Sequence, residues 1–551
     1  MLSEPVSQLL ERRAVLRLLA LGGGAALLAA CGQAAAPAAP TSVPATTAAK
    51  PAAAAATTSQ PAATVATTSQ PAAAQPKSGG TLRWGLLGNI VTLDGHNYGG
   101  TAHIFHVFDR LIVLDDQLKW QPRLAESWDV NNDYTQIKLN LRKGVQFHNG
   151  RELTSDDVVW NFTRVKDPSV GGGIFASYVA PLQSVENPDK YAVVITTKQP
   201  YPYVSHILQT LNILDPATMQ QPDGVNNPVG TGPFKFVEFA QGDHLTLAKN
   251  PNYWRSGLPY VDTLQMPIFA DPQTQVTALE GGSIDTAVNA ALRDAARLQT
   301  TNRYQVLLNK NSGALYVIQP NTTIDPTSNK LLRQAMQYGI DRQRIADTVL
   351  LKLGDPTELP WFPTSPAYDT AKNQTYSFDL DKAEALVQQA GLSNVEMDFN
   401  YSTAVGELAS MAQIIQSDLA KIGVTLRLKP TDPPQLAAQQ YQVKYNGVAA
   451  GTALFGQVQP GVQFGSPYYG PLNNWSGFKD QQYTSLAAAM STETDPARAK
   501  QAYAAYTDYL LDQSFTIGVA TLLPRIAMTA RVQGVRYDMA YILSATEAWL
   551  A

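Results

Sequence analysis

Few residues of this 551-residue chain have types and spacings that could support covalent or metal chemistry. Its one cysteine, Cys31, excludes an intramolecular disulfide and a cysteine-rich metal site. Of the six histidines, His103 and His106 stand at helical spacing, but a metal site needs further ligands and only His96 lies nearby. The segment GGSID fails as a nucleophile elbow because Asp285 stands where that motif requires glycine. We therefore expect no catalytic residue, no metal and no cofactor, and a metal role for His103 and His106 stays open.

The flanks of Cys31 indicate what its thiol does. Arg12, Arg13 and Arg17 precede an apolar segment, 18–30, that is too short to cross a bilayer but has the length of a signal-peptide core. The sequence LAAC that ends at Cys31 resembles the lipobox of bacterial lipoproteins, in which the thiol receives a diacylglyceryl group. We expect residues 1–31 to be a lipoprotein signal peptide. The alternative is an ordinary secretory signal, and the arginine pair, which resembles a twin-arginine signal, leaves the export route open.

Residues 32–78 separate this signal from the rest of the chain. They contain no aromatic and no acidic residue, and the octapeptide ATTSQPAA occurs twice. Such a composition offers too little apolar surface to offset conformational entropy, so we expect a disordered tether. As a flexible coil it would reach on the order of 40 Å.

The body, from Gly79 onward, is long enough for two or three domain-sized cores. The whole chain carries a net charge of −4, and its N-terminal 78 residues are net basic, so the body is acidic. An acidic body without basic runs argues against nucleic acid as a partner.

Local patterns predict a mixture of strands and helices. In YTQIKLNLR, Ile137, Leu139 and Leu141 alternate with polar residues, as in a half-buried strand. Thr154 with Asp157 three residues later predicts a helix start. Two amphipathic segments, DLDKAEALVQQAG and LASMAQIIQSDLAKIG, each end at a glycine and favour helices. The second runs into the alternating segment VTLRLKP, and such helix–strand units indicate an α/β lobe.

Four blocks in order resemble one protein family. They lie at 122–162 (PRLAESWDVNND and onward), 226–254 (NNPVGTGPFKF and onward), 329–350 (NKLLRQAMQYGIDRQ and onward) and 381–392 (DKAEALVQQAGL). Together they resemble the family 5 extracellular solute-binding proteins of ABC importers, typified by dipeptide, oligopeptide and nickel receptors. The resemblance runs from about residue 80 to 540. It also suits the start of the chain, because a receptor that works beside a permease has to be exported and then kept near the membrane.

The resemblance implies an α/β fold: a two-lobed clamshell of the periplasmic-binding-protein type II, in its large three-subdomain form. Hinges are expected near 315–320 and 518–522. The expected parts are lobe I at 79–315 with an inserted subdomain near 120–228, lobe II at 316–519, and a return to lobe I at 520–551. A ligand that touches both lobes only in the closed form shifts the population toward closure.

The resemblance also places the ligand between a loop near 87–100 and a segment near 448–461. Peptide receptors of this family usually carry an aspartate in the second segment for the ligand's ammonium group, but no Asp or Glu stands between Asp432 and Asp480. A buried ammonium without a counter-charge costs several kcal/mol, which puts a free peptide N-terminus in doubt. The segments expected to line the cleft contain aromatic rings and side-chain amides, which suit a neutral polar ligand. The predicted ligand contacts are Asn97, Tyr98, Trp361, Phe455, Tyr468, Asn474 and Trp475.

We therefore expect an exported, lipid-anchored, monomeric receptor that delivers a solute to ABC permease subunits and touches the membrane only through its anchor. Peptide is the family default. A neutral ligand such as an oligosaccharide is the alternative within this class, and a secreted hydrolase is the alternative outside it.

Overall fold

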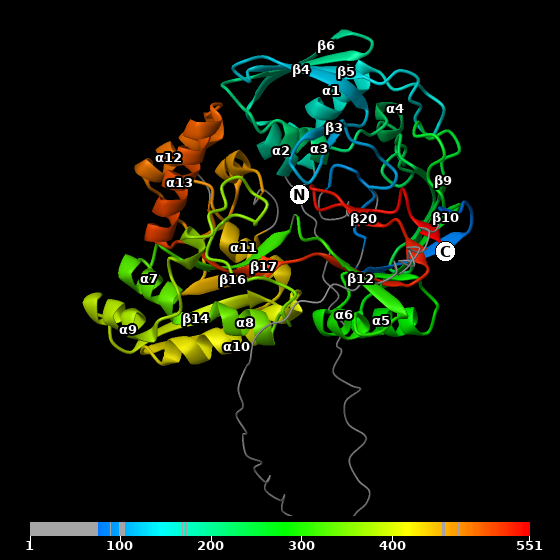
Figure 1. Cartoon of the computed structure of the whole chain (residues 1–551). Coiled ribbons are helices and arrows are strands. Elements are labelled where there is room, and N and C mark those ends of the chain that lie inside the picture. The colour runs from blue at the N-terminus through cyan, green and yellow to red at the C-terminus, as the bar shows by residue number, and fades with distance from the viewer. Residues whose placement is uncertain are drawn as a thin grey trace, which may run out of the picture. The chain divides into compact units, whose positions relative to one another are not determined.

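The computed structural model describes residues 75–551 except 89, 98–104, 168, 171–173, 312, 454–457 and 472–473. The predicted signal peptide, Cys31 and nearly all of the predicted tether lie outside the described residues. In the part of the chain that is described, none of the helices combines the length and the apolar character needed to cross a bilayer. The described body is an α/β structure with two lobes, as predicted (Figure 1).

The first lobe is built on a seven-stranded mixed sheet. The strand order is β12 (Tyr304–Leu308), β18 (Arg525–Thr529), β11 (Thr286–Val288), β1 (Thr81–Leu87), β10 (Thr263–Phe269), β9 (His244–Lys249) and β8 (Phe234–Ala240). Leu82, Trp84 and Leu86 alternate along β1 and form a core on one face of the sheet. Helices α5 (Pro272–Glu280) and α6 (Leu292–Leu298) pack with the other face, so this sheet is covered on both sides.

An inserted subdomain lies above this sheet in Figure 1. Its antiparallel sheet has the order β4 (Ala125–Val130), β5 (Gln136–Leu141), β7 (Ala192–Thr197) and β6 (Leu182–Asp189). The alternation predicted for β5 is confirmed, because Ile137, Leu139 and Leu141 are buried. Helix α1 (Ser155–Arg164) begins as predicted after Thr154, whose backbone N–H donates to Asp157 Oδ2 over 2.8 Å.

The subdomain also contributes a short hairpin and three short helices. The hairpin pairs β2 (Ile112–Leu114) with β3 (Trp120–Pro122). The helices are α2 (Ile174–Val179), α3 (Ser205–Thr210) and α4 (Pro216–Met219). All six residues of α3 are buried, so this helix lies inside the protein.

The second lobe is built on a five-stranded sheet of order β15 (Val424–Thr431), β14 (Val395–Ser402), β16 (Val448–Ala453), β13 (Ala314–Pro320) and β17 (Ile517–Leu522). The first three strands are mutually parallel, so their carboxyl ends share one edge. Helices α9 (Leu380–Gln389) and α10 (Gly406–Ala420) lead into β14 and β15, which confirms the predicted helix–strand units. Gly391 and Gly423 follow these helices with positive φ, as glycine permits.

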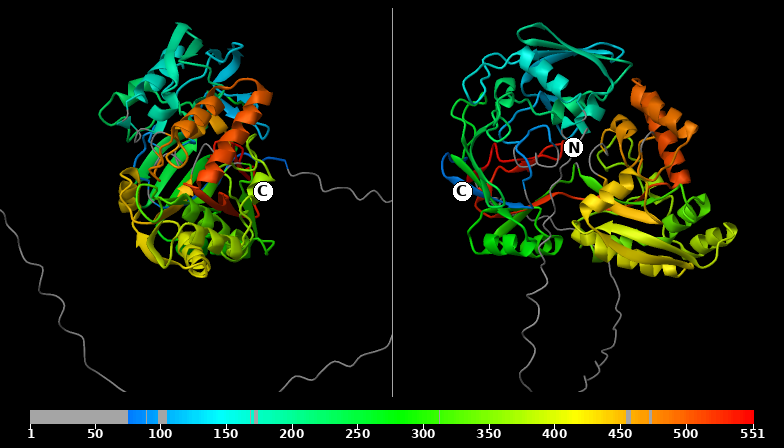
Figure 2. Two further views of the ribbon diagram at one scale, coloured as in Figure 1. Left: turned by 90° about the vertical axis from the view of Figure 1, so that its left-hand side faces the viewer. Right: turned by 180° about the vertical axis from the view of Figure 1, so that it is seen from behind.

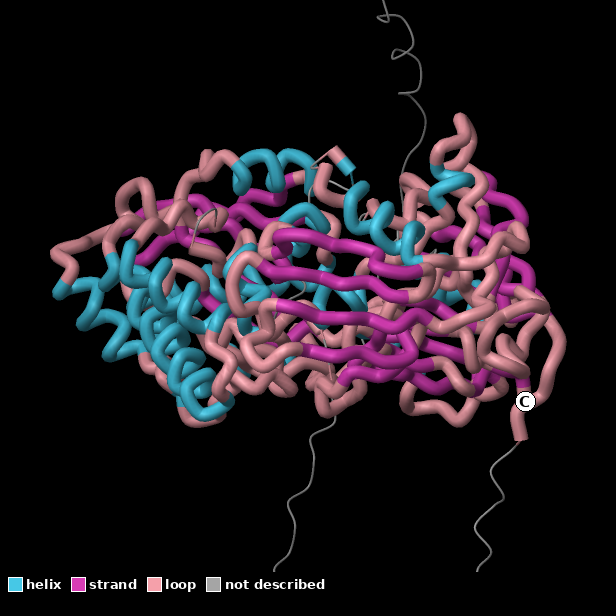
Figure 3. Tube along the Cα trace, turned by 90° about the horizontal axis from the view of Figure 1, so that it is seen from above, coloured by secondary structure: helices cyan, strands magenta, loops and turns pink. Residues whose placement is uncertain are grey.

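The remaining helices of this lobe are α7 (Lys330–Gly339), α8 (Arg342–Thr348), α11 (Pro433–Tyr441), α12 (Gln481–Thr492) and α13 (Pro496–Gln513), with 3₁₀ turns η3 (Lys372–Gln374) and η4 (Pro460–Gly465). Helices α12 and α13 pack against each other. Figure 3, seen from above, shows helices gathered at one side and strands crossing the middle.

As its described strands show, the chain crosses between the lobes twice, at 309–313 and at 523–524, where a strand of one lobe ends and a strand of the other begins. Both crossings lie beside the predicted hinges. Leu308 pairs with Arg525 before the passage and Ala314 pairs with Leu522 after it. Between them, Asn309 N–H donates to Pro524 O over 2.9 Å. The two segments therefore form one antiparallel ribbon, visible from behind in Figure 2.

Beyond β18 the chain stays on the first lobe. Its last strands form two short pairs, β19 (Val532–Gln533) with β22 (Trp549–Leu550), and β20 (Arg536–Tyr537) with β21 (Leu543–Ser544). Val532, Ala545 and Ala548 join the core beneath β1. The C-terminal segment is thereby part of the first lobe.

Candidate functional site

The inserted subdomain and the second lobe touch at Tyr203. Its hydroxyl shares a 2.8 Å hydrogen bond with the Tyr503 hydroxyl on α13 and also donates to Met490 O. Beside it, Ser205 Oγ donates to Gln459 Oε1 over 3.4 Å. The ring of Tyr203 lies so close to Gly461 that a Cβ at this glycine would stand 2.0 Å from ring atom Cδ2. The described structure therefore has its lobes in contact.

A cavity of about 480 Å³ opens at this contact, with walls from both lobes. One wall is formed by residues of α2 and of the segment that follows it as far as Tyr201. The other wall is formed by residues of η4 and α12. Its rings and aliphatic groups are Tyr178, Pro181, Tyr201, Val462 and Phe464. A volume of this size is in the range of small-molecule sites, which are mostly apolar with a few placed polar groups.

The charge in this cavity is positive. Among the described lining residues, Lys198 is the one charged side chain, and its Nζ donates to Ala180 O over 2.8 Å. No Asp or Glu stands at any position after residue 75 that the structure leaves undescribed. The described lining of this cavity thus gives no carboxylate for a ligand's ammonium group.

Three buried polar side chains lie at the same junction: His206 on α3, Gln459 and Gln463. In the described part of the chain, no partner is found for His206 Nε2, Gln459 Nε2 or either amide atom of Gln463. Buried polar atoms normally have hydrogen-bond partners, because a buried donor or acceptor without one costs free energy. Groups without a partner are therefore typical of a site that hydrogen-bonds to a polar ligand.

These groups are uncharged. Burial lowers the pKa of His206 to about 4, so the imidazole is neutral at physiological pH. Its ring contacts the Tyr178 ring edge-on with centroids 4.5 Å apart, which connects the buried polar groups to the cavity wall. The junction can therefore bind a ligand through neutral donors and acceptors.

Three aromatic rings contact one another in a row on the second lobe, one pair edge-on and the other tilted, and form a ring cluster. The ring of Tyr441 lies 5.2 Å from that of Trp475, which lies 4.8 Å from that of Tyr468. The Tyr468 hydroxyl donates to Thr452 O over 2.7 Å, so this ring cluster is attached to the carboxyl end of β16. Tyr441 is 70% exposed, which leaves one ring available to solvent. Ligands of parallel sheets commonly bind at this end of the strands.

The structure places the predicted contact residues in different surroundings. Tyr468 and Trp475 contact each other in the ring cluster, whereas Tyr98 and Phe455 lie outside the described residues. Asn97 follows β1 in a turn in which its N–H donates to Asp94 O.

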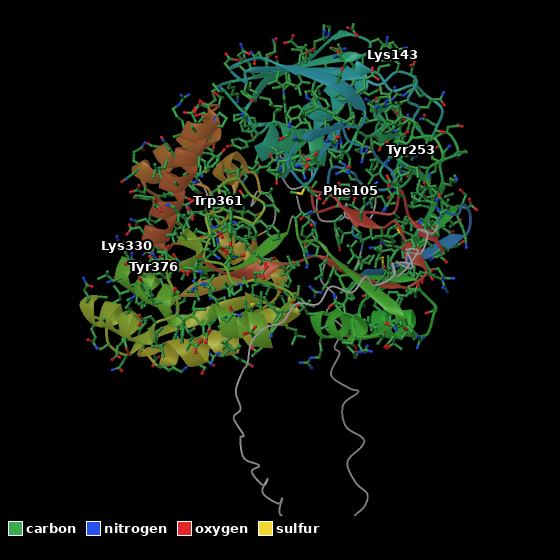
Figure 4. All side chains as sticks on the ribbon, in the orientation of Figure 1. Phe105, Lys143, Tyr253, Lys330, Trp361 and Tyr376 are labelled. Atoms are coloured by element: carbon green, nitrogen blue, oxygen red, sulfur yellow. The ribbon has the colours of Figure 1, made fainter. Side chains whose placement is uncertain are left out.

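Trp361 and Asn474 belong to the framework of the second lobe. Trp361 is fully buried, and its indole N–H donates to Thr507 Oγ1 over 2.8 Å (Figure 4). Asn474 is 4% exposed and donates to Gly470 O and Phe478 O, which closes a turn. The structure places both side chains inside the lobe and not on the cavity wall.

The histidines considered as metal ligands are otherwise engaged where they are described. His96 is fully buried, with Nε2 against Asn212 O and Nδ1 accepting from Arg164, which also pairs with Asp94. His106 Nε2 accepts from Ala545 N–H, and His103 lies outside the described residues. Within the described ranges, no group of three or more His, Cys, Asp or Glu side chains could hold a metal.

Sequence reasoning missed His206, Gln459 as a junction residue, Gln463 and Gly461. A glycine that faces a ring from a distant segment has no local signature, because its role depends on the contact between lobes. The one available signal was the group of glutamines between 457 and 463. It indicated that this segment lines the cleft but not which of its side chains would lie at the contact between the lobes.

Comparisons with known proteins agree on one group. The sequence model of bacterial extracellular solute-binding proteins, family 5 Middle, matches residues 119–501. Heme-binding protein A of Haemophilus influenzae is 27% identical over 480 residues, which cover 79% of this chain and 86% of that protein. The glutathione-binding protein GsiB of Escherichia coli is 26% identical over 450 residues, covering 77% and 86%. The solved structure of AgaA from A. tumefaciens R10, in complex with agropinic acid, is 27% identical with a TM-score of 0.75, covering 86% and 99%.

Proposed function

This chain belongs to the bacterial extracellular solute-binding proteins of family 5, and from that premise we propose that it captures a peptide-like solute without a free ammonium group and delivers it to an ABC permease. It is a binding receptor and not an enzyme, like its relatives. The names of those relatives refer to heme, glutathione and agropinic acid, so an oligosaccharide gains no support from them.

The observation that carries the solute class is the charge of the cavity between the lobes. Its described lining contains Lys198 and no carboxylate, and neutral His206, Gln459 and Gln463 lie beside it. An ammonium group taken out of water here would lack a partner, at a cost of several kcal/mol. A carboxylate can pair with Lys198, and amide bonds can use the neutral donors and acceptors. We therefore propose an N-blocked or acidic solute with amide groups.

Binding works through the two-lobe geometry. A solute that hydrogen-bonds to α3 on one side and to η4 on the other interacts with both lobes only when they are together, so it shifts the population toward closure. Rings such as Phe464 and Tyr201 supply apolar contact area, and the ring cluster that contains Tyr468 and Trp475 offers further aromatic surface. The permease is proposed to recognise the closed arrangement.

Export and anchoring complete the proposal. The lipobox-like sequence before Cys31 supports lipidation of that thiol, and two acyl chains hold a protein at a membrane where one does not. Residues 32–78 are proposed to act as the tether between the anchor and the body. Both features rest on the sequence.

The test is a thermal-shift screen of the purified protein with matched peptides. Free-amine dipeptides and tripeptides are compared with their N-acetylated forms and with glutathione. A bound solute stabilises by RT ln(1 + [L]/Kd), about 2.7 kcal/mol at 100 times Kd. We expect N-acetylated acidic peptides to raise Tm and free-amine forms to be weaker. A shift with free-amine peptides that acetylation abolishes would contradict the proposed solute class.

A matched pair of variants locates the solute's carboxylate. Lys198→Gln should weaken binding of the acidic solute about tenfold, the value of a charge-assisted hydrogen bond of roughly 1.5 kcal/mol. Lys330→Gln, at a lysine that pairs with Asp512 on the second lobe (Figure 4), should leave binding unchanged. Equal effects of the two substitutions would show that Lys198 does not contact the solute.

A further inference from the structure

A second, smaller cavity lies in the first lobe, where the base of the inserted subdomain meets the C-terminal strands. Its volume is about 70 Å³, and its walls include Arg110, Arg123, Arg255 and Arg536. Figure 4 labels Phe105, which lines this cavity, and Tyr253, which stands two residues before the lining residue Arg255. The residues that line it are different from those of the cavity between the lobes. We call it the Arg123 cavity.

Three of these arginines have acidic partners. Arg110 Nη2 lies 2.7 Å from Asp538 Oδ2, and Arg255 Nη2 lies 2.6 Å from Glu547 Oε1. Arg536 also pairs with Glu547, so two guanidinium groups share one carboxylate. The C-terminal strands therefore meet the subdomain base through a network in which positive charge is in excess.

Arg123 is the cation without a partner. In the described chain, no carboxylate lies within ion-pair distance of its guanidinium group and no acceptor is found for it. Burial lowers the pKa of Arg123, and the positive charges of Arg255 and Arg110 lower it further. A partly buried guanidinium among other cations is unfavourable unless an anion accompanies it.

Asp109, the acid whose charge acts on Arg123, does not fill this role. Asp109 is buried and also lines the cavity. Its oxygens accept from Trp254 Nε1 over 2.7 Å, from Tyr253 Oη over 3.1 Å and from Thr231 Oγ1 over 3.2 Å. This carboxylate is thus held by neutral donors on the side of the rings, and its attraction reaches Arg123 only at longer range.

We propose that the Arg123 cavity binds one small oxyanion, a phosphate or sulfate ion or a free carboxylate, with the guanidinium of Arg123 as its main ligand. On the same measure a cavity needs about 10–15 Å³ to hold one water molecule, so a cavity of about 70 Å³ admits an ion of a few heavy atoms and not a peptide. The planar donors of arginine match such oxygens in pairs. The bound ion joins the subdomain base to the β20–β21 hairpin, and this site does not depend on the solute proposed above.

Equilibrium dialysis of the full-length protein with radiolabelled inorganic phosphate tests the proposal at constant ionic strength. We expect saturable uptake of one ion per chain. Competition with unlabelled sulfate and with acetate identifies the preferred chemistry, since displacement by sulfate indicates a tetrahedral ion and displacement by acetate alone indicates a carboxylate. Uptake that never saturates, or that chloride removes equally well, would overturn the proposal.

Variants assign the ion to Arg123. Arg123→Gln should lower phosphate affinity at least tenfold, and Arg123→Lys, which keeps the charge but loses the paired donors, should lie in between. The control Arg427→Gln removes an exposed arginine that pairs with Asp398 on the second lobe, and it should bind phosphate like the wild type. If Arg123→Gln fails to fold, Arg123→Lys decides alone. Wild-type affinity in a folded Arg123 variant would show that the ion lies elsewhere.

Discussion

Replacing Gly461 with alanine should separate the two lobes of this receptor. A Cβ at this position would lie 2.0, 2.2 and 2.7 Å from three ring atoms of Tyr203. Unstrained carbon atoms stay about 3.5–4.0 Å apart, so the ring or the backbone has to move by about 1.5–2 Å. The ring cannot easily turn away, because Tyr203 is only 8% exposed and its hydroxyl is bonded to Tyr503 and Met490.

The magnitude follows from overpacking. Extra methyl groups in a packed interface cost about 1–3 kcal/mol. Opening the lobes relieves the clash but gives up the hydrogen bonds of Tyr203, at about 0.5–1.5 kcal/mol each. We therefore expect Gly461→Ala to shift the open–closed equilibrium toward the open form by about 1–3 kcal/mol, or roughly 5–150-fold.

Small-angle scattering measures this shift as a larger radius of gyration in the variant. The matched double variant Gly461→Ala with Tyr203→Ala removes the obstructing ring and should recover part of the loss, with a coupling energy of about 1 kcal/mol or more. Tyr203→Phe, which keeps the ring and loses the hydroxyl, should open the lobes less. If Gly461→Ala were as compact as the wild type, or if the two substitutions were additive, the close approach of ring and glycine would not hold the lobes together.

Three further outcomes are expected. Because the folded-state pKa of His206 is lowered to about 4 from a usual 6.5, the unfolded chain binds this proton at a higher pH than the folded chain does, and His206 should lower the stability by up to 1.4 kcal/mol per pH unit as pH drops from about 6.5 to 4. Burial lowers the pKa of His96 and His148 to about 4 as well, so His206→Gln should reduce the slope of the pH profile of urea unfolding without abolishing it, and an unchanged slope would mean that His206 does not contribute. Glu407 on α10 pairs with Arg525 on β18 across the lobes over 3.1 Å. Glu407→Gln should lower the unfolding free energy by about 3 kcal/mol, because it leaves a largely buried cation without its partner. The double variant Glu407→Gln with Arg525→Met should be more stable than Glu407→Gln alone, and equal stability of these two variants would contradict this. Cys31→Ser should release the protein from membranes in a fractionation assay, whereas retention would rule out lipidation as its anchor.

Local structure was predictable where neighbours in sequence determine it. In the strand Gln136–Leu141, apolar and polar residues alternate in the sequence as buried and more exposed positions do in the structure. Thr154 and Asp157 mark the start of α1 within four residues. Turn glycines such as Gly391 and Gly423 follow from backbone sterics alone. The resemblance of ordered blocks then supplied the two-lobed arrangement, which no single pattern could give.

The site was less predictable because its contacts join distant segments. Tyr468 and Trp475 are near in sequence, and the structure brings their rings together. Trp361 has the same residue type but packs on Tyr506 inside the lobe, and nothing in the segment PWFPTSP distinguishes a buried ring from a ligand contact. The approach of Gly461 to Tyr203 and the neutral state of His206 depend on burial between lobes, which periodicity does not encode.

The ribbon that joins the lobes limits how they can swing. Its two segments lie side by side, bonded between Asn309 and Pro524 and flanked by the pairs Leu308–Arg525 and Ala314–Leu522. Bending such a ribbon within its own plane would shear these bonds, whereas flexing it out of plane leaves them intact. The lobes should therefore move by out-of-plane flexing and twisting of this ribbon, and a spectroscopic distance measured between the lobes would report that movement.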